Sequence, residues 1–384
     1  MYSISGYGSM LADRVRMDAY AAALRAAIQP GAVVLDIGAG TGILSFLACQ
    51  FGARKVYAVE TADAIAVARE MARENGLGDR IEFIQAKSTD LELPDRADVI
   101  VSDLRGVLPL LQAHIPSIID ARRRLLAPGG VLIPARDELW AAVVEAPERY
   151  GRLTDPWATD RFGFDMRIAR DMVTNTWEKA TVPPEQLLTE PQAWASIDYS
   201  TVESADVAGT VVSTVARHGV AHGIVMWFDA VLGEGARFSN APGEPPLIYG
   251  SGFFPLSAPV DVEPGDRIAV SLRADLVQSD YVWSWDTTVQ DGNSATTKAH
   301  FRQSTFFGGP LSIERVHTRG SSYKPALTDR GAVDSTILQA MTGQQTLDHI
   351  AQLVMDQHPG HFPSRREALA RVADLSEQYS RSRT

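Results

Sequence analysis

The sequence predicts an α/β fold in three parts: a Rossmann-like parallel-sheet domain, an antiparallel β-barrel domain and a small helical C-terminal extension. Between residues 31 and 134, short apolar runs alternate with helical stretches, which is typical of a parallel sheet covered on both faces. Residues 135–325 instead carry short alternating segments separated by turn residues. Helical spacing returns later, so we expect domains at 1–134, 135–325 and 330–384.

The composition limits the classes of function that the chain can have. Its 384 residues suit two or three domains, and 36 basic against 47 acidic residues give a net charge of −11. An acidic chain is a poor match for a phosphate backbone, so we expect no nucleic-acid partner. No apolar run reaches about 18 residues, so we expect no membrane span. The single cysteine, Cys49, excludes an intramolecular disulfide and a cysteine-based zinc site. Because no signal-peptide pattern opens the chain, we expect a cytoplasmic protein. We also predict no metal site.

The first part is predicted to open with a helical segment, residues 1–30, that precedes the parallel sheet. Helical stretches separate the five expected strands, as in βαβ units. The strands are expected at Val33–Ile37, Val56–Val59, Ile81–Ile84, Val99–Val101 and Val131–Ile133.

The second part is predicted to be an antiparallel barrel or sandwich, with alternating segments such as Gly209–Val215 and Arg267–Leu272. Trp283 and Trp285 share one side of a strand. They could wall a substrate pocket, but core packing is the interpretation that we favour. The proline-containing stretch 150–190 is expected to be an excursion from this body.

The last part is expected to hold two or three short helices around a small core. Leu347, Ile350, Ala351 and Val354 have the spacing of one helical face. Residues 364–367 read Ser-Arg-Arg-Glu and fit a helix capping box.

Residues 33–44 hold the strongest local motif, an apolar strand that runs through Asp36 into Gly38, Gly40 and Gly42 and then into a helix. Glycine permits a tight turn and the close approach of a ligand to the backbone. Glu60 follows the next strand, where a carboxylate can accept both hydroxyl groups of a ribose. We therefore predict a nucleotide-type ligand at this edge. The alternative is that Asp36 only caps the loop and Glu60 is solvated.

The glycine spacing departs from the dinucleotide pattern G-x-G-x-x-G and resembles the D-x-G-x-G-x-G loop of methyltransferases that use S-adenosyl-L-methionine. Over residues 1–325 the chain also resembles the protein arginine methyltransferase family. The segments that carry this likeness are Met10–Tyr20, Ile81–Pro94, Ala121–Gly130, Phe162–Met166 and His222–Asp229.

The resemblance implies S-adenosyl-L-methionine as the cofactor and a peptide, protein or small molecule as the methyl acceptor. Arg16 falls at the arginine that binds the methionine carboxylate, a task that suits a bidentate guanidinium. A helical arm at about 150–180 and a homodimer are also implied. The predicted cofactor-binding residues are Met10, Arg16, Asp36, Gly38, Gly40, Thr41, Glu60, Thr61, Ser88 and Thr89.

The sequence departs from the family at two places, and both concern the substrate. The family holds the substrate guanidinium with two glutamates, whose positions here are Asp103 and Gln112. Arg105 places a cation in the same loop. The family's Thr-His-Trp run corresponds to residues 247–249, Leu-Ile-Tyr, so the histidine that would pair with Asp13 is missing.

Three residues are candidates for the chemistry of methyl transfer. Asp103 could orient or deprotonate the nucleophile at the end of the fourth strand. Gln112 could hydrogen-bond an amide, imidazole or hydroxyl group, or be an exposed helix residue. His114 could be a general base, although a structural role is the more usual one for a lone histidine.

These residues favour a methyltransferase that acts on a nitrogen or oxygen of a peptide, protein or natural product. A true arginine methyltransferase with a rearranged loop and a non-catalytic, cofactor-binding scaffold are the alternatives. Residues 335–351 also resemble winged-helix modules that bind leader peptides, and a plain helical extension is the alternative there.

Overall fold

A computed structural model describes residues 3–158, 163–294, 296–310, 312, 314 and 317–380. The chain forms two compact units, Met1–Gly309 and Pro310–Thr384. The first unit therefore ends soon after the last β-strand, whereas the sequence placed the end of the barrel domain at residue 325.

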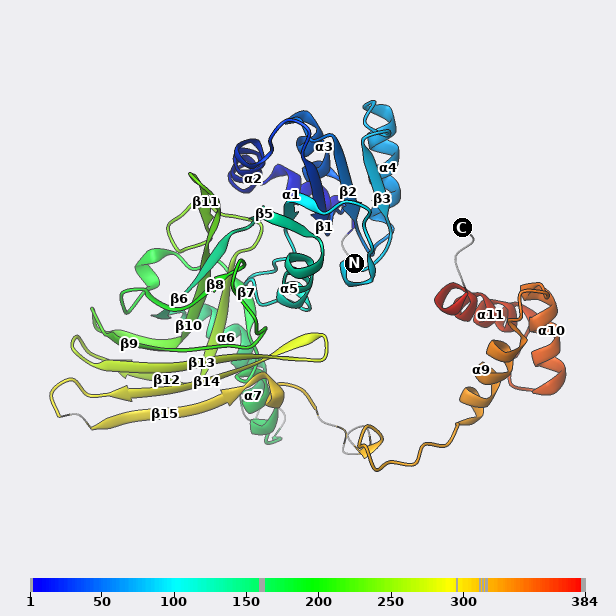
Figure 1. The fold of residues 1–384 in the computed structure, drawn as a ribbon. Coiled ribbons are helices and arrows are strands. Elements are labelled where there is room, and N and C mark those ends of the chain that lie inside the picture. The colour runs from blue at the N-terminus through cyan, green and yellow to red at the C-terminus, as the bar shows by residue number, and fades with distance from the viewer. Residues whose placement is uncertain are drawn as a thin grey trace. The chain divides into compact units, whose positions relative to one another are not determined.

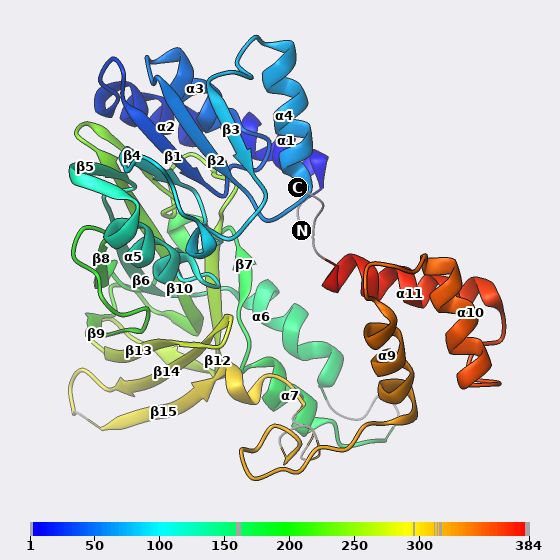
Figure 2. The same cartoon turned by 45° about the vertical axis from the view of Figure 1, so that its right-hand side comes forward.

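A five-stranded parallel sheet occupies one end of the first unit (Figures 1 and 2). Its order is β3-β2-β1-β4-β5, so β1 lies at the centre and the order reverses between β1 and β4. Each predicted strand is present; β2 begins one residue earlier than expected, and the last two strands are several residues longer. The strands are β1 (Val33–Ile37), β2 (Lys55–Val59), β3 (Ile81–Ile84), β4 (Ala97–Ser102) and β5 (Leu126–Ile133).

Helices connect these strands as the alternation predicted. The helix after the glycine loop begins directly after Gly42, whose φ of 85° lies in the left-handed region that favours glycine. The connecting elements are α3 (Ile43–Gln50), α4 (Ala64–Glu74), the 3-10 turn η1 (Ser88–Asp90) and α5 (His114–Arg124).

The N-terminal segment forms two helices, α1 (Ile4–Ala12) and α2 (Arg14–Ala27), separated by Asp13. Asp13 caps α2, because its carboxylate accepts from the Arg16 backbone N–H at 3.1 Å. Helix α2 buries Met17, Tyr20 and Leu24 and packs against both the parallel sheet and the antiparallel strands.

The second half of the first unit is antiparallel, as predicted, and forms two hydrogen-bonded sheets. One has the path β7-β12-β10-β6-β8, with β11 paired to β10, and the other has the order β15-β14-β13-β9. Trp283 and Trp285 are buried, with ring centroids 5.2 and 5.4 Å from that of Phe254, which confirms the core-packing interpretation. The strands are β6 (Arg136–Val144), β7 (Glu178–Ala180), β8 (Gln192–Asp198), β9 (Val207–Thr214), β10 (Gly219–Gly233), β11 (Ala236–Ser239), β12 (Ser251–Val262), β13 (Arg267–Val277), β14 (Asp280–Gln290) and β15 (Thr297–Ser304).

A helical arm connects β6 to β7, in the stretch where the sequence placed one. It contains α6 (Pro147–Thr154), the 3-10 turn η2 (Asp155–Trp157) and α7 (Arg167–Val173). Phe164 and Ile168 are 70% and 80% exposed at its tip. Phe162, part of the motif that marked the arm, lies outside the described residues. Two further 3-10 turns follow in the unit, η3 (Pro184–Gln186) and η4 (Thr305–Phe307).

The second unit has a small core of its own, formed by α9 (Asp329–Ala340), α10 (Leu347–Gln357) and α11 (Arg365–Tyr379). Ser364 accepts from the Glu367 backbone N–H, which confirms Ser364 as the N-cap of α11. Ile350, Ala351 and Val354 are buried, but Leu347 is exposed at the first position of its helix, contrary to the spacing argument.

The winged-helix interpretation of this unit is wrong. Residues 317–380 contain helices and turns but no strand, and a wing is a β-hairpin. The plain helical extension is what the chain forms. No helix in the described part of the chain is long and apolar enough to cross a bilayer.

Candidate active site

The glycine loop lies at the carboxyl edge of the parallel sheet, beside the point where the strand order reverses. Gly38 and Gly40 have φ values of 77° and 53°, which favour glycine. A Cβ at Gly38 would lie 2.4 Å from the Leu104 side chain, and one at Gly40 would lie 2.6 Å from the Tyr7 ring. Larger residues are therefore excluded by both backbone conformation and space.

Glu60 reaches the same loop from the end of β2. Its Oε2 accepts from the Gly40 backbone N–H at 3.0 Å, and its Oε1 accepts from the Ala62 backbone N–H at 2.8 Å. The Thr61 hydroxyl donates to Oε1 at 3.4 Å. These contacts fix a half-buried carboxylate at the edge of the sheet, beside the glycines.

Asp36 lies beneath the loop and is buried. Its Oδ2 accepts from the Ser45 hydroxyl at 2.7 Å, while its Oδ1 is buried without a partner. Burial raises the pKa of Asp36 to about 7, although the bond from Ser45 acts in the opposite direction. Asp36 thus supports the loop from below and retains an unused acceptor.

Three further predicted cofactor residues follow the strands at this edge and differ in how much of the side chain is exposed. Thr41 is half-buried in the turn before α3, Ser88 is buried in η1, and Thr89 is exposed. Arg124 ties η1 to α5, because it donates to the backbone carbonyls of both Ser88 and Thr89, at 3.2 and 3.1 Å.

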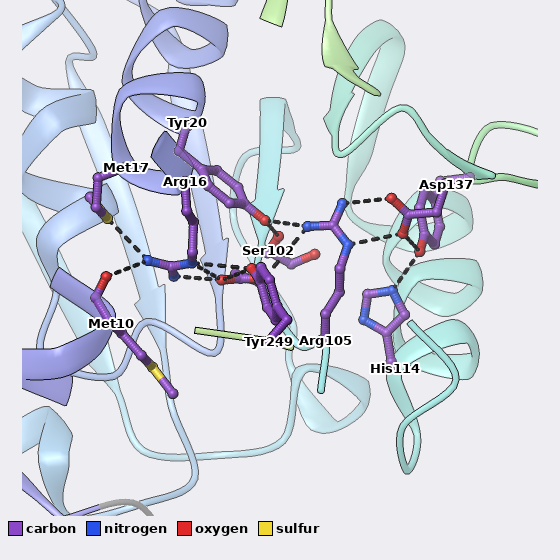
Figure 3. Close-up of polar contacts among 11 residues, drawn as sticks. Met10, Arg16, Met17, Tyr20, Ser102, Arg105, His114, Asp137 and Tyr249 are labelled. Carbon is purple, nitrogen blue, oxygen red and sulfur yellow. Dashed lines mark hydrogen bonds and ion pairs between the residues drawn. The ribbon is translucent and has the colours of Figure 1, made fainter. Parts of the chain in front are cut away.

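Arg16 and Asp103 form a buried ion pair, and this was not foreseen (Figure 3). The Arg16 guanidinium donates to Asp103 Oδ2 from Nε at 2.6 Å and lies 2.5 Å from it through Nη2. The Tyr249 hydroxyl lies 2.7 and 2.8 Å from the two Asp103 oxygens and accepts from Arg16 Nε at 3.1 Å. Arg16 Nη1 also donates to the Met10 carbonyl at 3.0 Å. The predicted carboxylate-binding arginine and the predicted nucleophile-orienting aspartate are therefore direct partners.

The pKa of Asp103 is below its usual value. Burial acts to raise it, but the charges of Arg16 and Arg105 and the hydrogen bond from Tyr249 outweigh burial. Asp103 is therefore ionised at neutral pH and is a hydrogen-bond acceptor rather than a strong base.

A second buried guanidinium lies on the other side of Tyr249 in the view of Figure 3. Arg105 donates from Nε and Nη2 to the two oxygens of Asp137 in β6, at 2.9 and 3.0 Å. Its Nη1 donates to the Tyr20 hydroxyl at 2.7 Å and lies 3.5 Å from Asp103 Oδ1. Arg105 thus connects the loop between β4 and α5, residues 103–113 (the acceptor loop), with helix α2 and with the antiparallel sheet.

His114 belongs to this network and is not open to a substrate. Its Nε2 lies 3.0 Å from the Tyr199 hydroxyl, which itself donates to Asp137 at 2.5 Å. Burial first, and the charge of Arg105 second, lower the pKa of His114 to about 3. These contacts favour the structural role over that of a general base.

Gln112 lies in the turn before α5, exposed and with a φ of 45°. It does not join Asp103 in the buried network, so the two family clamp positions are not brought together in this conformation. Ile248 does reach Asp13: its backbone N–H donates to Asp13 Oδ2 at 2.8 Å. The backbone N–H of residue 248 thus makes the contact with Asp13 that the family's histidine side chain would make.

Sequence reasoning missed Tyr20, Asp137, Tyr199 and Tyr249. Only Tyr249 carried a usable signal, because it occupies the family's tryptophan position. A lone acid in an alternating strand, such as Asp137, has the same pattern whether it faces solvent or a buried arginine.

Comparison with known proteins now assigns the chain to a family. Residues 28–186 match the model of a methyltransferase domain, and residues 135–291 match that of an arginine methyltransferase oligomerization subdomain. A probable protein arginine N-methyltransferase 6 of Arabidopsis thaliana is 30% identical over 320 residues, which cover 80% of this chain and 69% of the relative. The chain belongs to the protein arginine N-methyltransferase family. It is an S-adenosyl-L-methionine-dependent methyltransferase.

Other family members agree with this assignment. Protein arginine N-methyltransferase 6 of Danio rerio is 36% identical over 233 residues, 57% of this chain and 66% of the relative. The crystal structure of Arabidopsis thaliana protein arginine methyltransferase 10 superposes with a TM-score of 0.69 at 26% identity, covering 79% of this chain and 97% of the other. A Trypanosoma brucei PRMT1 enzyme–prozyme complex shares the fold, with a TM-score of 0.71 at 23% identity over 78% of this chain and 96% of that one.

The groups at the sheet edge suit this cofactor. The Glu60 carboxylate, which could accept ribose hydroxyls, and the unpartnered Oδ1 of Asp36 lie at the glycine loop. The Arg16 guanidinium, which could bind a carboxylate, is paired here with Asp103. In Figure 3, Met10 and Arg16 lie on the same side of the network. The donor set is therefore chemically complementary to S-adenosyl-L-methionine.

The buried His114 predicts a defined loss of stability in acid. Its folded-state pKa is about 3, below the ordinary value of 6.5, so the unfolded chain takes up the proton first as the pH falls from 6.5 toward 3. The wild type should lose more unfolding free energy across this window than His114→Gln, by up to about 1.4 kcal/mol per pH unit. Urea unfolding at several pH values measures this, with His349→Gln as an exposed control. Equal pH slopes for wild type and His114→Gln would contradict the buried, neutral histidine.

Proposed function

We propose that this methyltransferase transfers the methyl group to a nitrogen or oxygen of a peptide, protein or natural product, without the two-carboxylate clamp of its family. The observation that carries the proposal is the state of the acceptor loop. Asp103 is its one buried carboxylate and is already paired with Arg16, while Gln112 is exposed in a turn. A guanidinium requires charge-assisted partners in fixed geometry, and this loop offers few.

In this proposal, each group at the sheet edge has a separate task. Glu60 holds the ribose hydroxyls, and Arg16 holds the methionine carboxylate, for which Asp103 is a competing anion. S-adenosyl-L-methionine, when bound, supplies an electrophilic methyl group on a sulfonium. Asp103, ionised and fixed by Tyr249, accepts a hydrogen bond from the N–H or O–H of the acceptor and so aligns its lone pair.

Arginine methylation is the second candidate, and the relatives' names favour it. It requires Asp103 to leave Arg16 and a rearranged 103–113 loop to supply further acceptors. Methyl transfer to arginine-rich peptides at rates comparable to those for uncharged acceptors would favour this candidate over the first.

The first prediction of the proposal concerns cofactor binding. Replacing Glu60 with Ala removes an acceptor for two hydroxyl groups, each worth about 1.5–3 kcal/mol when the partner is charged. The affinity for S-adenosylhomocysteine should fall by about 100-fold or more in calorimetry. Glu82→Ala, at an exposed glutamate paired with Lys55, is the matched control and should bind as the wild type does. Unchanged affinity in Glu60→Ala would exclude this cofactor site.

The second prediction concerns the acceptor. Asp103→Asn should lower methyl transfer by about 100-fold, because the orienting charge is lost. S-adenosylhomocysteine affinity should be retained, because an amide does not compete with a carboxylate for Arg16. Isotope-labelled methyl transfer to a panel of hydroxyl, imidazole, amide and guanidinium compounds measures the rate. Asp95→Asn, at an exposed pair with Arg54, is the control. A fully active Asp103→Asn enzyme would remove Asp103 from the mechanism.

We further propose that the chain forms a homodimer through the arm between β6 and β7. Phe164 and Ile168 both expose large apolar side chains on the arm, and exposed apolar surface is a feature of interaction sites. The match to an oligomerization subdomain includes this stretch.

Sedimentation of a doubly substituted arm tests this dimer. The variant with Phe164→Ser and Ile168→Ser should sediment as a monomer, since the apolar area that drives association is removed. Val212→Ser is the control, because Val212 is half exposed on β9, away from the arm. A dimer of unchanged stability in the double variant would mean that the arm is not the interface.

A further inference from the structure

Arg105 is the one basic residue of the acceptor loop, and the proposed reaction does not use it. Its side chain has no exposed area, and its guanidinium lies 5.5 and 5.6 Å from the ring centroids of Phe228 and Phe238. Asp137 holds it through two hydrogen bonds, and Tyr20 holds a third nitrogen. A guanidinium fixed on three sides cannot move aside for a ligand without leaving Asp137 as an unpaired buried charge.

The charges of this network cancel. Asp103 and Asp137 contribute two negative charges, and Arg16 and Arg105 contribute two positive ones. Asp137 is saturated by Arg105 and by the Tyr199 hydroxyl. Of the two acids, only Asp103 has some exposed area, and Arg105 Nη1 lies 3.5 Å from its Oδ1.

A cationic acceptor at Asp103 would therefore meet a four-residue network that carries no net negative charge. It would approach a fixed guanidinium in a region of low dielectric, where like charges repel strongly. It would also meet the positive charge of a sulfonium donor. An uncharged N–H or O–H group meets neither penalty and can still donate to Asp103.

On the basis of the proposed function, we infer that Arg105 is a specificity-determining residue that excludes cationic acceptors, so that the methyl acceptor is an uncharged nitrogen or oxygen group. In the transfer, the acceptor lone pair forms the bond to the methyl carbon, and the sulfur–methyl bonding pair returns to sulfur. The acceptor's N–H or O–H proton then leaves to solvent, so the positive charge passes from the sulfonium to the released proton.

Arginine and citrulline are the matched probes, because their side chains have nearly the same shape and differ in charge. Fluorescence anisotropy with short glycine peptides that carry one central arginine or citrulline gives the ratio of the two affinities on protein saturated with S-adenosylhomocysteine. The wild type should show no preference for arginine. A tenfold or greater preference of the wild type for the arginine peptide would overturn the inference.

Two variants assign the effect to the charge of Arg105. Arg105→Met leaves the network with one excess negative charge, so its arginine-to-citrulline ratio should rise at least tenfold. The double variant Arg105→Met with Asp137→Asn removes one charge of each sign, so its ratio should stay at the wild-type value. If Arg105→Met does not bind S-adenosylhomocysteine, Arg105→Gln, which keeps a donor for Asp137, takes its place.

If Arg105→Met, or Arg105→Gln in its place, binds S-adenosylhomocysteine but gains no preference for the arginine peptide, the role of Arg105 is also overturned. Failure of the proposed function gives a different result. In that case the wild type would not bind S-adenosylhomocysteine, or would transfer no methyl group to any uncharged compound in the panel.

Discussion

The buried ion pair between Arg105 and Asp137 is the interaction on which the rest of the site depends. Arg105 lies in the loop after β4 of the parallel sheet, and Asp137 lies in β6 of the antiparallel sheet. The pair therefore fixes one half of the unit against the other. Buried charges are tolerated only when they are paired and hydrogen-bonded. Tyr20 and Tyr199 complete that requirement, and loss of one charged partner typically costs about 3–5 kcal/mol.

The position of Asp103 follows from this constraint. Because Arg105 cannot move, Asp103 lies between one fixed guanidinium and a second one, Arg16, supplied by helix α2. Arg16 is thereby linked both to the loop that faces the acceptor and to the edge that suits the cofactor. If Arg16 binds the methionine carboxylate, as we propose, that carboxylate and Asp103 compete for the same guanidinium.

Local patterns predicted much of the fold and one side of the site. The parallel strands, the glycine loop with Glu60 and the N-cap at Ser364 depend on neighbouring residues, and the structure contains all of them. The winged-helix expectation failed because an apolar helical run has the same spacing in a three-helix unit as in a winged helix. Exposed Leu347 shows the same limit: helical spacing does not fix how far the buried face extends to the helix end.

The sequence by itself determined that this chain is a methyltransferase-type α/β protein with a glycine loop, an acid after the second strand and changes at both family clamp positions. Only the tertiary structure decided which residues Asp103, at the first clamp position, contacts. Arg16 and Tyr249 are 233 positions apart, and Arg105 and Asp137 are 32 apart, yet each pair meets in a buried hydrogen bond. Periodicity reports only which face of an element a residue occupies. The identity of its partner across the interior depends on how the two halves pack, and that packing sets the charge of the site.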